Sequence, residues 1–207
     1  SPRDIVLTNN GNNKIKVEVT DKVWNLTVLT SGEYQIDKSN ATGSFSVNSQ
    51  DWTNTDVVTR FTPSNSGSGV KHWRYATSSD DGKTWSNWSD YIPGQSSKDI
   101  TISSNGVNRV KVEVLNNANI SNVLTTGKIK IDKIKPTAIL TPNKMNWTNK
   151  TIPVTINMDD EGGSGIKSWR GRLSNNGGNT WNEWGGINTA SNKVFNVDVE
   201  GNNVVAE

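Results

Sequence analysis

The sequence contains no cysteine in 207 residues, and it contains one histidine and two methionines. The absence of cysteine excludes a disulfide framework and zinc sites built on thiolates, and it fits the cytosol or a bacterial surface built without disulfides. With a single His and no recurring pair of acids in a recognisable cleft, the chain offers no residues for a catalytic mechanism. We therefore predict that the protein is not an enzyme.

Long hydrophobic runs and charge blocks are also absent. No window approaches 18 apolar residues and no signal peptide begins the chain, so we predict no membrane insertion. The 22 basic and 20 acidic residues give a net charge of +2 and are interspersed, a pattern that gives no basis for nucleic-acid binding. The start at Ser1-Pro2 without Met indicates a processed or excised fragment.

Apolar residues make up 31% of the chain, which is low for one large core, and Asn, Ser, Thr and Gly dominate the rest. Thin β-sandwiches tolerate this composition, because each strand buries one face and offers the other to water. Nine Trp residues supply much of the missing apolar volume. A disordered polar chain would lack these aromatic residues, so we predict an ordered β protein.

The chain repeats itself at an offset of 95 or 96 residues, and we read this repeat as its main organising feature. Five segments return in order: 10–11 at 105–106, 34–38 at 128–133, 51–54 at 146–149, 67–73 at 163–169, and 84–88 at 180–184. The phase predicts three parts. Residues 1–38 are the C-terminal part of a repeat, 39–134 are a complete repeat, and 135–207 are the N-terminal part of a further, truncated repeat.

Strand patterns are clear in the complete repeat. Apolar and polar residues alternate at period two over 57–61, 72–77, 99–102, 109–114 and 128–131. Turn clusters rich in Ser, Asn and Gly separate these segments. About seven short strands in a unit of about 95 residues are typical of an immunoglobulin-like sandwich. The predicted fold is therefore all-β, with tandem immunoglobulin-like β-sandwich domains.

Several motifs resemble the tandem bacterial immunoglobulin-like (Big-type) repeats of large cell-surface and adhesin proteins. They are Ile-Asp-Lys-Ile-Lys-Pro-Thr at 131–137, Trp-Thr-Asn at 147–149, Ser-Gly-Ser-Gly-Val at 66–70 and the hairpin at 75–85. The junction at 38–42 departs from the pattern because it lacks the Pro, and the corner at 116–119 is degenerate. The resemblance implies an extracellular location, on a bacterial surface or secreted, with neighbouring repeats of the same or adjacent chains as partners.

Ser-Ser-Asp-Asp-Gly-Lys-Thr-Trp at 78–85 also fits the Asp-box of sialidase-like β-propellers, and 174–181 repeats it with Asn in place of Asp. The motif builds a hairpin: the acid accepts backbone hydrogen bonds, Gly takes a positive φ, and Trp packs under the loop. The expected hairpin residues are Ser78, Asp80, Gly82, Thr84, Trp85, Ser174, Asn176, Gly178, Thr180 and Trp181. A sialidase would need clustered Arg and an activated Tyr, and no Tyr recurs, so we interpret the motif as structural.

Two weaker kinds of site remain open. Trp88 and Trp184 follow the hairpins and could stack on sugars, although recurring Trp residues also suit core and loop packing. Asp159, Asp160 and Glu161 could bind Ca²⁺ as an optional cofactor, but their expected equivalents are Thr62, Pro63 and Ser64. Asp37 and Asp132 lie beside the junctions and could join a calcium site. Trp24 has no counterpart and is expected to be exposed.

These observations favour a non-catalytic structural or adhesion module, a repeat segment of a surface stalk or fibre. Short linkers such as 133–137, stiffened by Pro136, would limit bending between repeats. One alternative is a carbohydrate-binding module that uses the loop Trp residues on surface glycans. Another is a filament subunit, in which the split repeats at the two ends complete each other head to tail.

Overall fold

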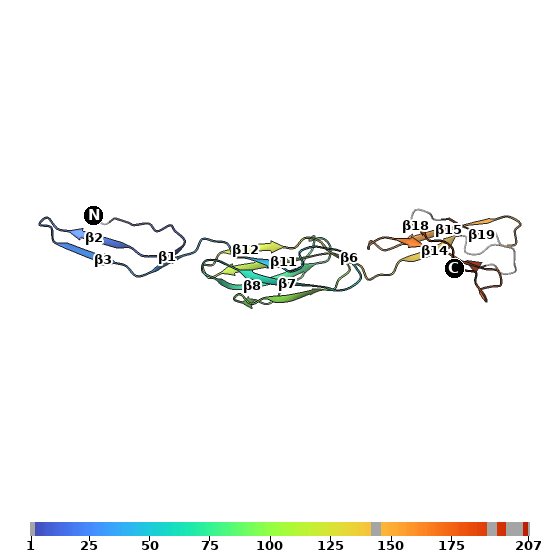
Figure 1. The fold of residues 1–207 in the computed structure, drawn as a ribbon, viewed down its shortest axis with the longest axis horizontal. Helices are drawn as coiled ribbons and strands as arrows, with labels where there is room; N and C mark the ends of the chain where they lie inside the picture. The colour runs from blue at the N-terminus through green and yellow to red at the C-terminus, as the bar shows by residue number, and fades with distance from the viewer. Residues whose placement is uncertain (1–2, 142–145, 190–193, 198–204, 207) are drawn as a thin grey trace. The chain divides into compact units, whose positions relative to one another are not determined.

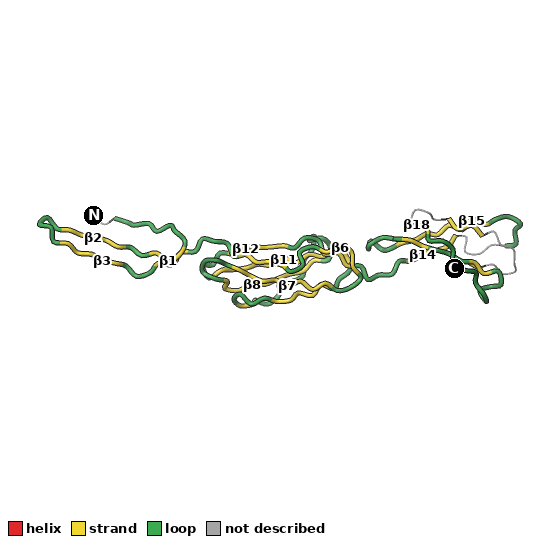
Figure 2. Tube along the Cα trace, viewed as in Figure 1, coloured by secondary structure: helices red, strands yellow, loops and turns green. Residues whose placement is uncertain are grey.

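The structure is a computed structural model that describes residues 3–141, 146–189, 194–197 and 205–206. Within these residues it contains strands, turns and loops and no helix (Figure 2). No helix that could cross a membrane therefore occurs in the described part of the chain. Contacts divide the chain into unit 1, Ser1–Ile131, and unit 2, Asp132–Glu207. The prediction of an all-β, immunoglobulin-like sandwich fold is confirmed.

The main body of unit 1 is a sandwich of two sheets (Figure 1). One sheet has three strands in the order β10-β7-β5, and the other has the order β6-β13-β11-β8-β9, with β12 also paired to β11. All pairs are antiparallel except β13 with β6. The strands are β5 (Thr42–Phe45), β6 (Gln50–Thr53), β7 (Val57–Ser64), β8 (Val70–Ser78), β9 (Ile92–Pro93), β10 (Lys98–Ile102), β11 (Gly106–Asn116), β12 (Ser121–Thr125) and β13 (Ile129–Ile131).

The sandwich core lies between these sheets, because alternate residues of the central strands point inward. Strand β7 alternates buried and exposed positions along its whole length, and β11 buries every second residue. Phe61 and Trp73 meet in the middle with their ring centroids 5.0 Å apart. Burying such rings supplies much of the apolar area that the polar composition does not. The buried cluster comprises Ala41, Val57, Phe61, Val70, Trp73, Ile100, Ile102, Val110, Val112, Val114, Ile129 and Ile131.

The first 38 residues of unit 1 form two strand pairs, β1 (Gly11–Asn13) with β4 (Tyr34–Ile36), and β2 (Lys16–Thr20) with β3 (Leu26–Thr30). Their registers reproduce those of the sandwich 95 residues later. Gly11 faces Ile36 as Gly106 faces Ile131, and Lys16 faces Thr30 as Lys111 faces Thr125. Hence β1 and β2 match β11, whereas β3 and β4 match β12 and β13.

Unit 2 reproduces the other strands of the sandwich. The three-stranded order β14-β15-β19 matches β5-β7-β10, the pair β16–β18 matches β8–β9, and the pair β17–β20 matches β8–β11. The strands are β14 (Thr137–Thr141), β15 (Ile152–Asp159), β16 (Ser168–Trp169), β17 (Leu173–Ser174), β18 (Asn188–Thr189), β19 (Val194–Val197) and β20 (Val205–Ala206). Leu173, Val154 and Ile156 are its buried apolar residues among those described.

All five segments predicted as strands in the central repeat fall on strands β7, β8, β10, β11 and β13. Four strands were not predicted, namely β5, β6, β9 and β12, because they are short, lie at sheet margins or contain few apolar residues. The contact boundary falls after Ile131, close to the predicted limit at 134. The limits of the three predicted repeat parts stay predictions.

Candidate functional site

The Asp that follows the last strand of a repeat makes the same contact in both units. In unit 1, Asp37 follows β4, and its Oδ2 accepts hydrogen bonds from the Ser68 amide (2.7 Å) and the Ser68 hydroxyl (2.6 Å). The same carboxylate accepts hydrogen bonds from the amide and hydroxyl of Ser39 and from the Asn116 side chain. One carboxylate thus holds the connecting segment, the Gly-rich turn after β7 and the corner after β11.

In unit 2, Asp132 repeats this arrangement 95 residues later. Its Oδ2 accepts hydrogen bonds from the Ser164 amide (2.7 Å) and the Ser164 hydroxyl (2.8 Å), and its Oδ1 accepts one from the Ile134 amide (3.1 Å). Asp132 is 9% exposed. We call each of these contacts, Asp37–Ser68 and Asp132–Ser164, an aspartate latch.

Glycine is required beside each latch. A Cβ atom placed on Gly67 would collide with the carboxyl group of Asp37, and one placed on Gly163 would collide with that of Asp132. Neither glycine has a positive φ, so it is the close approach of the carboxylate, and not the backbone conformation, that excludes a side chain here. The recurring Gly-Ser-Gly segment is therefore the receptor half of the latch.

The latch hydrogen bonds favour the charged form of both acids. The hydroxyl of Ser39, followed by that of Ser68, lowers the pKa of Asp37 below its ordinary value. For Asp132 the Ser164 amide is the largest cause of a lowered pKa, and the Ser164 hydroxyl adds to it. Hydrogen bonds donated to a carboxylate stabilise the ion relative to the neutral acid. Both latches are consequently formed by ionised Asp at neutral pH.

The turn that receives the latch is shaped by its own polar residue. In unit 1 the Asn65 side-chain oxygen accepts hydrogen bonds from the amides of Gly67 and Gly69, each at 3.0 Å. In unit 2 Asp160 Oδ2 accepts one from the amide of Gly165 at 2.6 Å. Strand β7 ends one residue before Asn65, and β15 ends one residue before Asp160. Asp160 is therefore the equivalent of Asn65.

The alignment of 159–161 with Thr62, Pro63 and Ser64 is therefore wrong: the ends of β7 and β15 match Asp159 to Ser64 and Asp160 to Asn65, and Glu161 is the additional residue of the longer turn. Asp159 Oδ1 accepts hydrogen bonds from the amides of Asp160 and Glu161, and Glu161 is exposed with a φ of 40°. No group of three acidic or His side chains among the described residues is placed to hold a metal ion. A calcium site at 159–161 stays an untested prediction.

The loop after β8 is built on two polar side chains. Asp80 accepts hydrogen bonds from the Thr84 amide at 2.9 Å and the Thr84 hydroxyl at 2.5 Å, and these bonds, with one from Ser78, lower its pKa. The Ser78 hydroxyl accepts one from the Gly82 amide at 2.9 Å. Gly82 has a φ of 87°, which suits glycine, and Trp85 lies against it.

The loop after β17 uses the same arrangement with an amide. Asn176 Oδ1 accepts a hydrogen bond from the Thr180 amide at 3.0 Å, and its Nδ2 donates one to the Thr180 hydroxyl at 2.7 Å. The Ser174 hydroxyl accepts one from the Gly178 amide at 2.8 Å. Gly178 has a φ of 89°, and Trp181 lies beside it. A charged group is therefore not needed for this loop.

Beyond the loop in unit 1, cations alternate with aromatic rings spaced three residues apart. Lys111 Nζ lies 4.5 Å from the Trp85 ring centroid and 4.7 Å from that of Trp88. The Arg74 guanidinium carbon lies 4.8 Å from the Trp88 centroid and 5.0 Å from that of Tyr91. A spacing of three suits an extended segment with about three residues per turn, which directs all three rings to one side. We call this set the cation–aromatic ladder.

The ladder recurs in unit 2 with a different source of the cation. Arg172 lies 5.1 Å from the Trp181 centroid and 4.4 Å from that of Trp184, and Arg170 lies 4.5 Å from the latter. Arg172 stands at the position of Ala76. In unit 1, Lys111 pairs with Ala76 across β8 and β11. The cation thus occupies the same place but comes from the adjacent strand.

The ladder segment also closes the edge of β8. The Ser86 amide donates to the Thr77 carbonyl (2.8 Å) and the Ser86 hydroxyl accepts from the Thr77 amide (3.0 Å). Ser89 repeats both bonds with Tyr75, at 2.8 Å and 3.1 Å. Each serine therefore satisfies one amide and one carbonyl of β8. An edge saturated in this way offers no free groups to an added strand.

The Trp residues considered for sugar stacking are partly covered. Trp88 is half-buried beneath Arg74 and Lys111, and Trp184 is 39% exposed beside two Arg residues. The freely exposed rings are Trp24, at 86%, and Trp147, at 83%. Exposure of Trp24 agrees with the expectation from its missing counterpart. Stacking of sugars on Trp88 or Trp184 stays a prediction.

No protein-family model matches the chain, and no curated protein matches it. Among solved structures, the fibronectin(III)-like modules of Clostridium thermocellum CbhA are similar, with 20% sequence identity over 80% of this chain and 84% of that one. The TM-score is 0.32. At that value the likeness carries no argument about function, and the fold rests on the sheets and core described above.

Proposed function

We propose that the chain is a non-catalytic structural and adhesion module, a repeat segment of an extracellular bacterial stalk or fibre. The observation that carries this proposal is the aspartate latch, which is present at the start of both repeats that follow a connecting segment. Each latch bonds the connecting segment to a turn of the sandwich that follows, and it thereby fixes the direction in which the chain enters that sandwich. A chain of repeats built on this plan grows in length by a constant unit.

The two connecting segments differ in their backbone but share the latch. Pro136 fixes its own φ and favours an extended conformation in the preceding residue, whereas the segment around Lys38 contains no Pro. Lys38 instead donates hydrogen bonds from its amide to Asn10 Oδ1 and from Nζ to the Thr8 carbonyl, both at 3.0 Å. Both segments are thereby restrained at the latch Asp and at one neighbouring residue.

Backbone ¹⁵N relaxation of the 207-residue chain tests this role. A spacer predicts that amides of both units fit a single anisotropic rotational diffusion tensor. The double variant Asp37→Asn, Asp132→Asn should give separate, shorter correlation times, because the neutral amides accept these hydrogen bonds more weakly. Asp90→Asn is the matched control, since Asp90 is exposed and outside both latches. Independent tumbling of the units in the unchanged chain would refute the spacer role.

A specific observation supports the filament as a second candidate. Val17 and Val19 occupy the positions of Val112 and Val114, which are fully buried in the sandwich, yet they are 36% and 54% exposed. Leu29 is 59% exposed on the paired strand. An apolar face of this kind suits the early strands of a repeat, such as those of unit 2 in a second chain. Sedimentation velocity over a range of protein concentrations separates a self-associating chain from a monomeric spacer.

A further inference from the structure

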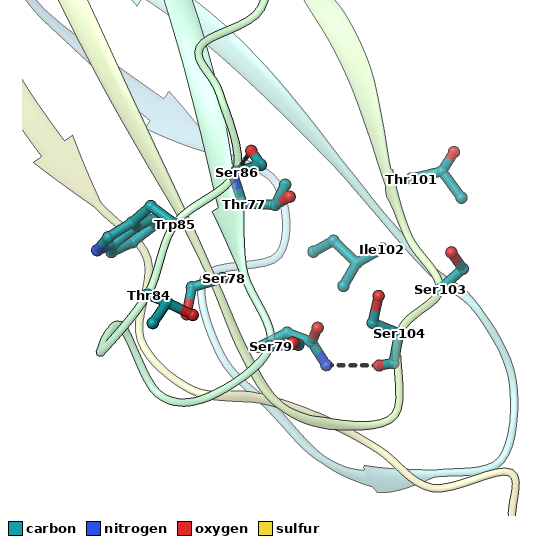
Figure 3. Close-up of a pocket in the computed structure, with 11 residues that line it drawn as sticks. Thr77, Ser78, Ser79, Thr84, Trp85, Ser86, Thr101, Ile102, Ser103 and Ser104 are labelled. Atoms are coloured by element: carbon teal, nitrogen blue, oxygen red, sulfur yellow. Dashed lines mark hydrogen bonds between the residues drawn. The ribbon is translucent and has the colours of Figure 1, made fainter.

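The sandwich in unit 1 has a cavity of about 370 Å³ at the end where β8 and β10 finish (Figure 3). It lies between the loop after β8 and the segment after β10, with Asn108 of β11 also in its wall. The lining residues are Thr77, Ser78, Ser79, Thr84, Trp85, Ser86, Thr101, Ile102, Ser103, Ser104 and Asn108. Its volume falls at the small end of the range for ligand sites, a size suited to one sugar ring.

The lining has an unusual chemistry, because eight of its eleven residues carry a hydroxyl group and none carries a charge. A hydroxyl both donates and accepts hydrogen bonds. A wall of hydroxyls therefore matches a neutral polyhydroxylated molecule and gives no counter-charge to an anion or a cation. Ile102 belongs to the buried core and the Trp85 ring stacks with Lys111, so the wall that a ligand would meet is chiefly polar.

Part of the wall is held rigid and part is free to bind. Ser78, Thr84 and Ser86 use their hydroxyls within the loop and at the β8 edge. Asn108, which is 2% exposed, donates from Nδ2 to the Ser104 carbonyl at 2.8 Å (Figure 3).

Four other hydroxyls of the wall make no hydrogen bond to any described residue, and they belong to Thr77, Ser79, Thr101 and Ser104. Ser79, Thr101 and Ser104 are exposed and Thr77 is half-buried, so these hydroxyls can exchange bound water for the hydroxyls of a ligand.

We propose that this hydroxyl-lined cavity binds a single ring of a neutral saccharide. Trp88 and Trp184 do not line the cavity, whereas Trp85 belongs both to its wall and to the ladder. The proposal is independent of the spacer role. It would give a repeat of a surface protein a weak contact with neutral glycans, without catalysis.

The test is a ¹⁵N–¹H correlation titration of the 207-residue chain with glucose, galactose, mannose and N-acetylglucosamine. Concentrations up to about 100 mM cover the millimolar affinities expected of a single ring. We expect saturable shifts of the amides of 77–79 and 101–104 with at least one neutral sugar, and none with glucuronate. In the double variant Thr101→Val, Ser104→Ala the affinity should fall at least tenfold, whereas Thr125→Val, outside the cavity, should leave it unchanged.

Two results would overturn the proposal. One is the absence of saturable shifts at these amides with all four neutral sugars, which would mean that the cavity holds water alone. The other is a set of shifts centred on Trp88 or Trp184, which would place sugar binding on the ladder. The dispersed spectrum of the unchanged chain reports that it is folded in these titrations, and the spectrum of each variant does the same for the affinity comparison.

Discussion

The carboxylate of Asp37 accepts hydrogen bonds from both the amide and the hydroxyl of Ser68, a residue 31 positions further along the chain. Asp132 and Ser164 make the same pair of bonds at a separation of 32. The extra position is the additional residue of the turn in unit 2, and the bonds are kept despite it. The turn differs in length by one residue, yet the hydrogen bonds from the serine amide and hydroxyl to the Asp carboxylate are kept in both units. The latch is therefore the constrained feature.

Replacement of Gly67 by Ala should break the latch in unit 1. The added Cβ would occupy the space of the Asp37 carboxyl group, and the displacement should cost about 1–3 kcal/mol of unfolding free energy. Gly32→Ala is the matched control, because its Cβ would meet nothing within 4 Å. Urea denaturation of both variants measures the difference, and equal midpoints would show that the Asp37 carboxylate is not packed against Gly67.

Acid should weaken both latches. The folded-state pKa values of Asp37, Asp80 and Asp132 are lowered by their hydrogen bonds, relative to about 3.9 in the unfolded chain. Their contribution to stability is therefore complete above that value and is lost as pH falls toward the folded-state pKa. Thermal unfolding between pH 7 and pH 2 should show this loss.

The variant Asp37→Asn provides the comparison for the acid experiment. It should unfold at a lower temperature at pH 7 and lose less stability on acidification, since one titrating group has been removed. Parallel pH profiles for the two proteins would contradict an ionised latch. Asp90→Asn, at an exposed position outside both latches, is the control for an Asp-to-Asn replacement as such.

The cation of the ladder should be exchangeable between strands. Lys111→Ala removes a charge that lies between Trp85 and Trp88, and it should cost about 0.5–2 kcal/mol of stability. Adding Ala76→Arg to this variant should restore part of the loss, because Arg172 serves from that position in unit 2. Lys83→Ala serves as the control, since Lys83 is exposed and outside the ladder. Chemical denaturation compares the variants, and a failure of Arg at 76 to rescue would mean that Lys111 acts only through local packing.

Replacing a core tryptophan by Ala should reduce stability far more than replacing a surface tryptophan. Trp73 is fully buried, and its indole N–H donates to the Ser96 carbonyl at 3.0 Å, so Trp73→Ala should cost about 3–5 kcal/mol. Trp24 is 86% exposed, and Trp24→Ala should change stability by less than about 0.5 kcal/mol. Equilibrium unfolding followed by far-ultraviolet circular dichroism measures both, and a comparable loss for Trp24 would place that ring in a core.

Sequence patterns predicted the strands that bury one face along most of their length. Strands β7 and β11 alternate clearly, and both were expected. Strand β5, Thr42–Phe45, has small residues at its middle positions, and β12 has two adjacent apolar residues, so neither shows period two. Their strand conformation comes from pairing with β7 and β11, which is tertiary information.

The latch was only half visible in the sequence. Both the Ile-Asp-Lys segment and the Gly-Ser-Gly segment were seen to recur, and Asp37 and Asp132 were considered as metal ligands. The bonds between the two segments depend on how β7 and its turn fold back toward the connecting segment, which no spacing in the sequence specifies. The cation–aromatic ladder could not be predicted from the sequence for a related reason. Lys111 reaches the Trp rings only because β11 pairs with β8 in the register that places Lys111 opposite Ala76.

The most direct test of the account is a through-hydrogen-bond scalar coupling experiment on the deuterated, ¹³C,¹⁵N-labelled chain. The aspartate latch predicts a coupling from the Ser68 amide nitrogen to the Asp37 side-chain carboxyl carbon, and a second from Ser164 to Asp132. Both couplings should be present at pH 7 and should weaken only at a pH low enough to protonate the two carboxylates, whose pKa values their hydrogen bonds lower. The absence of both couplings at pH 7, in a spectrum that shows those between β8 and β11, would contradict the account.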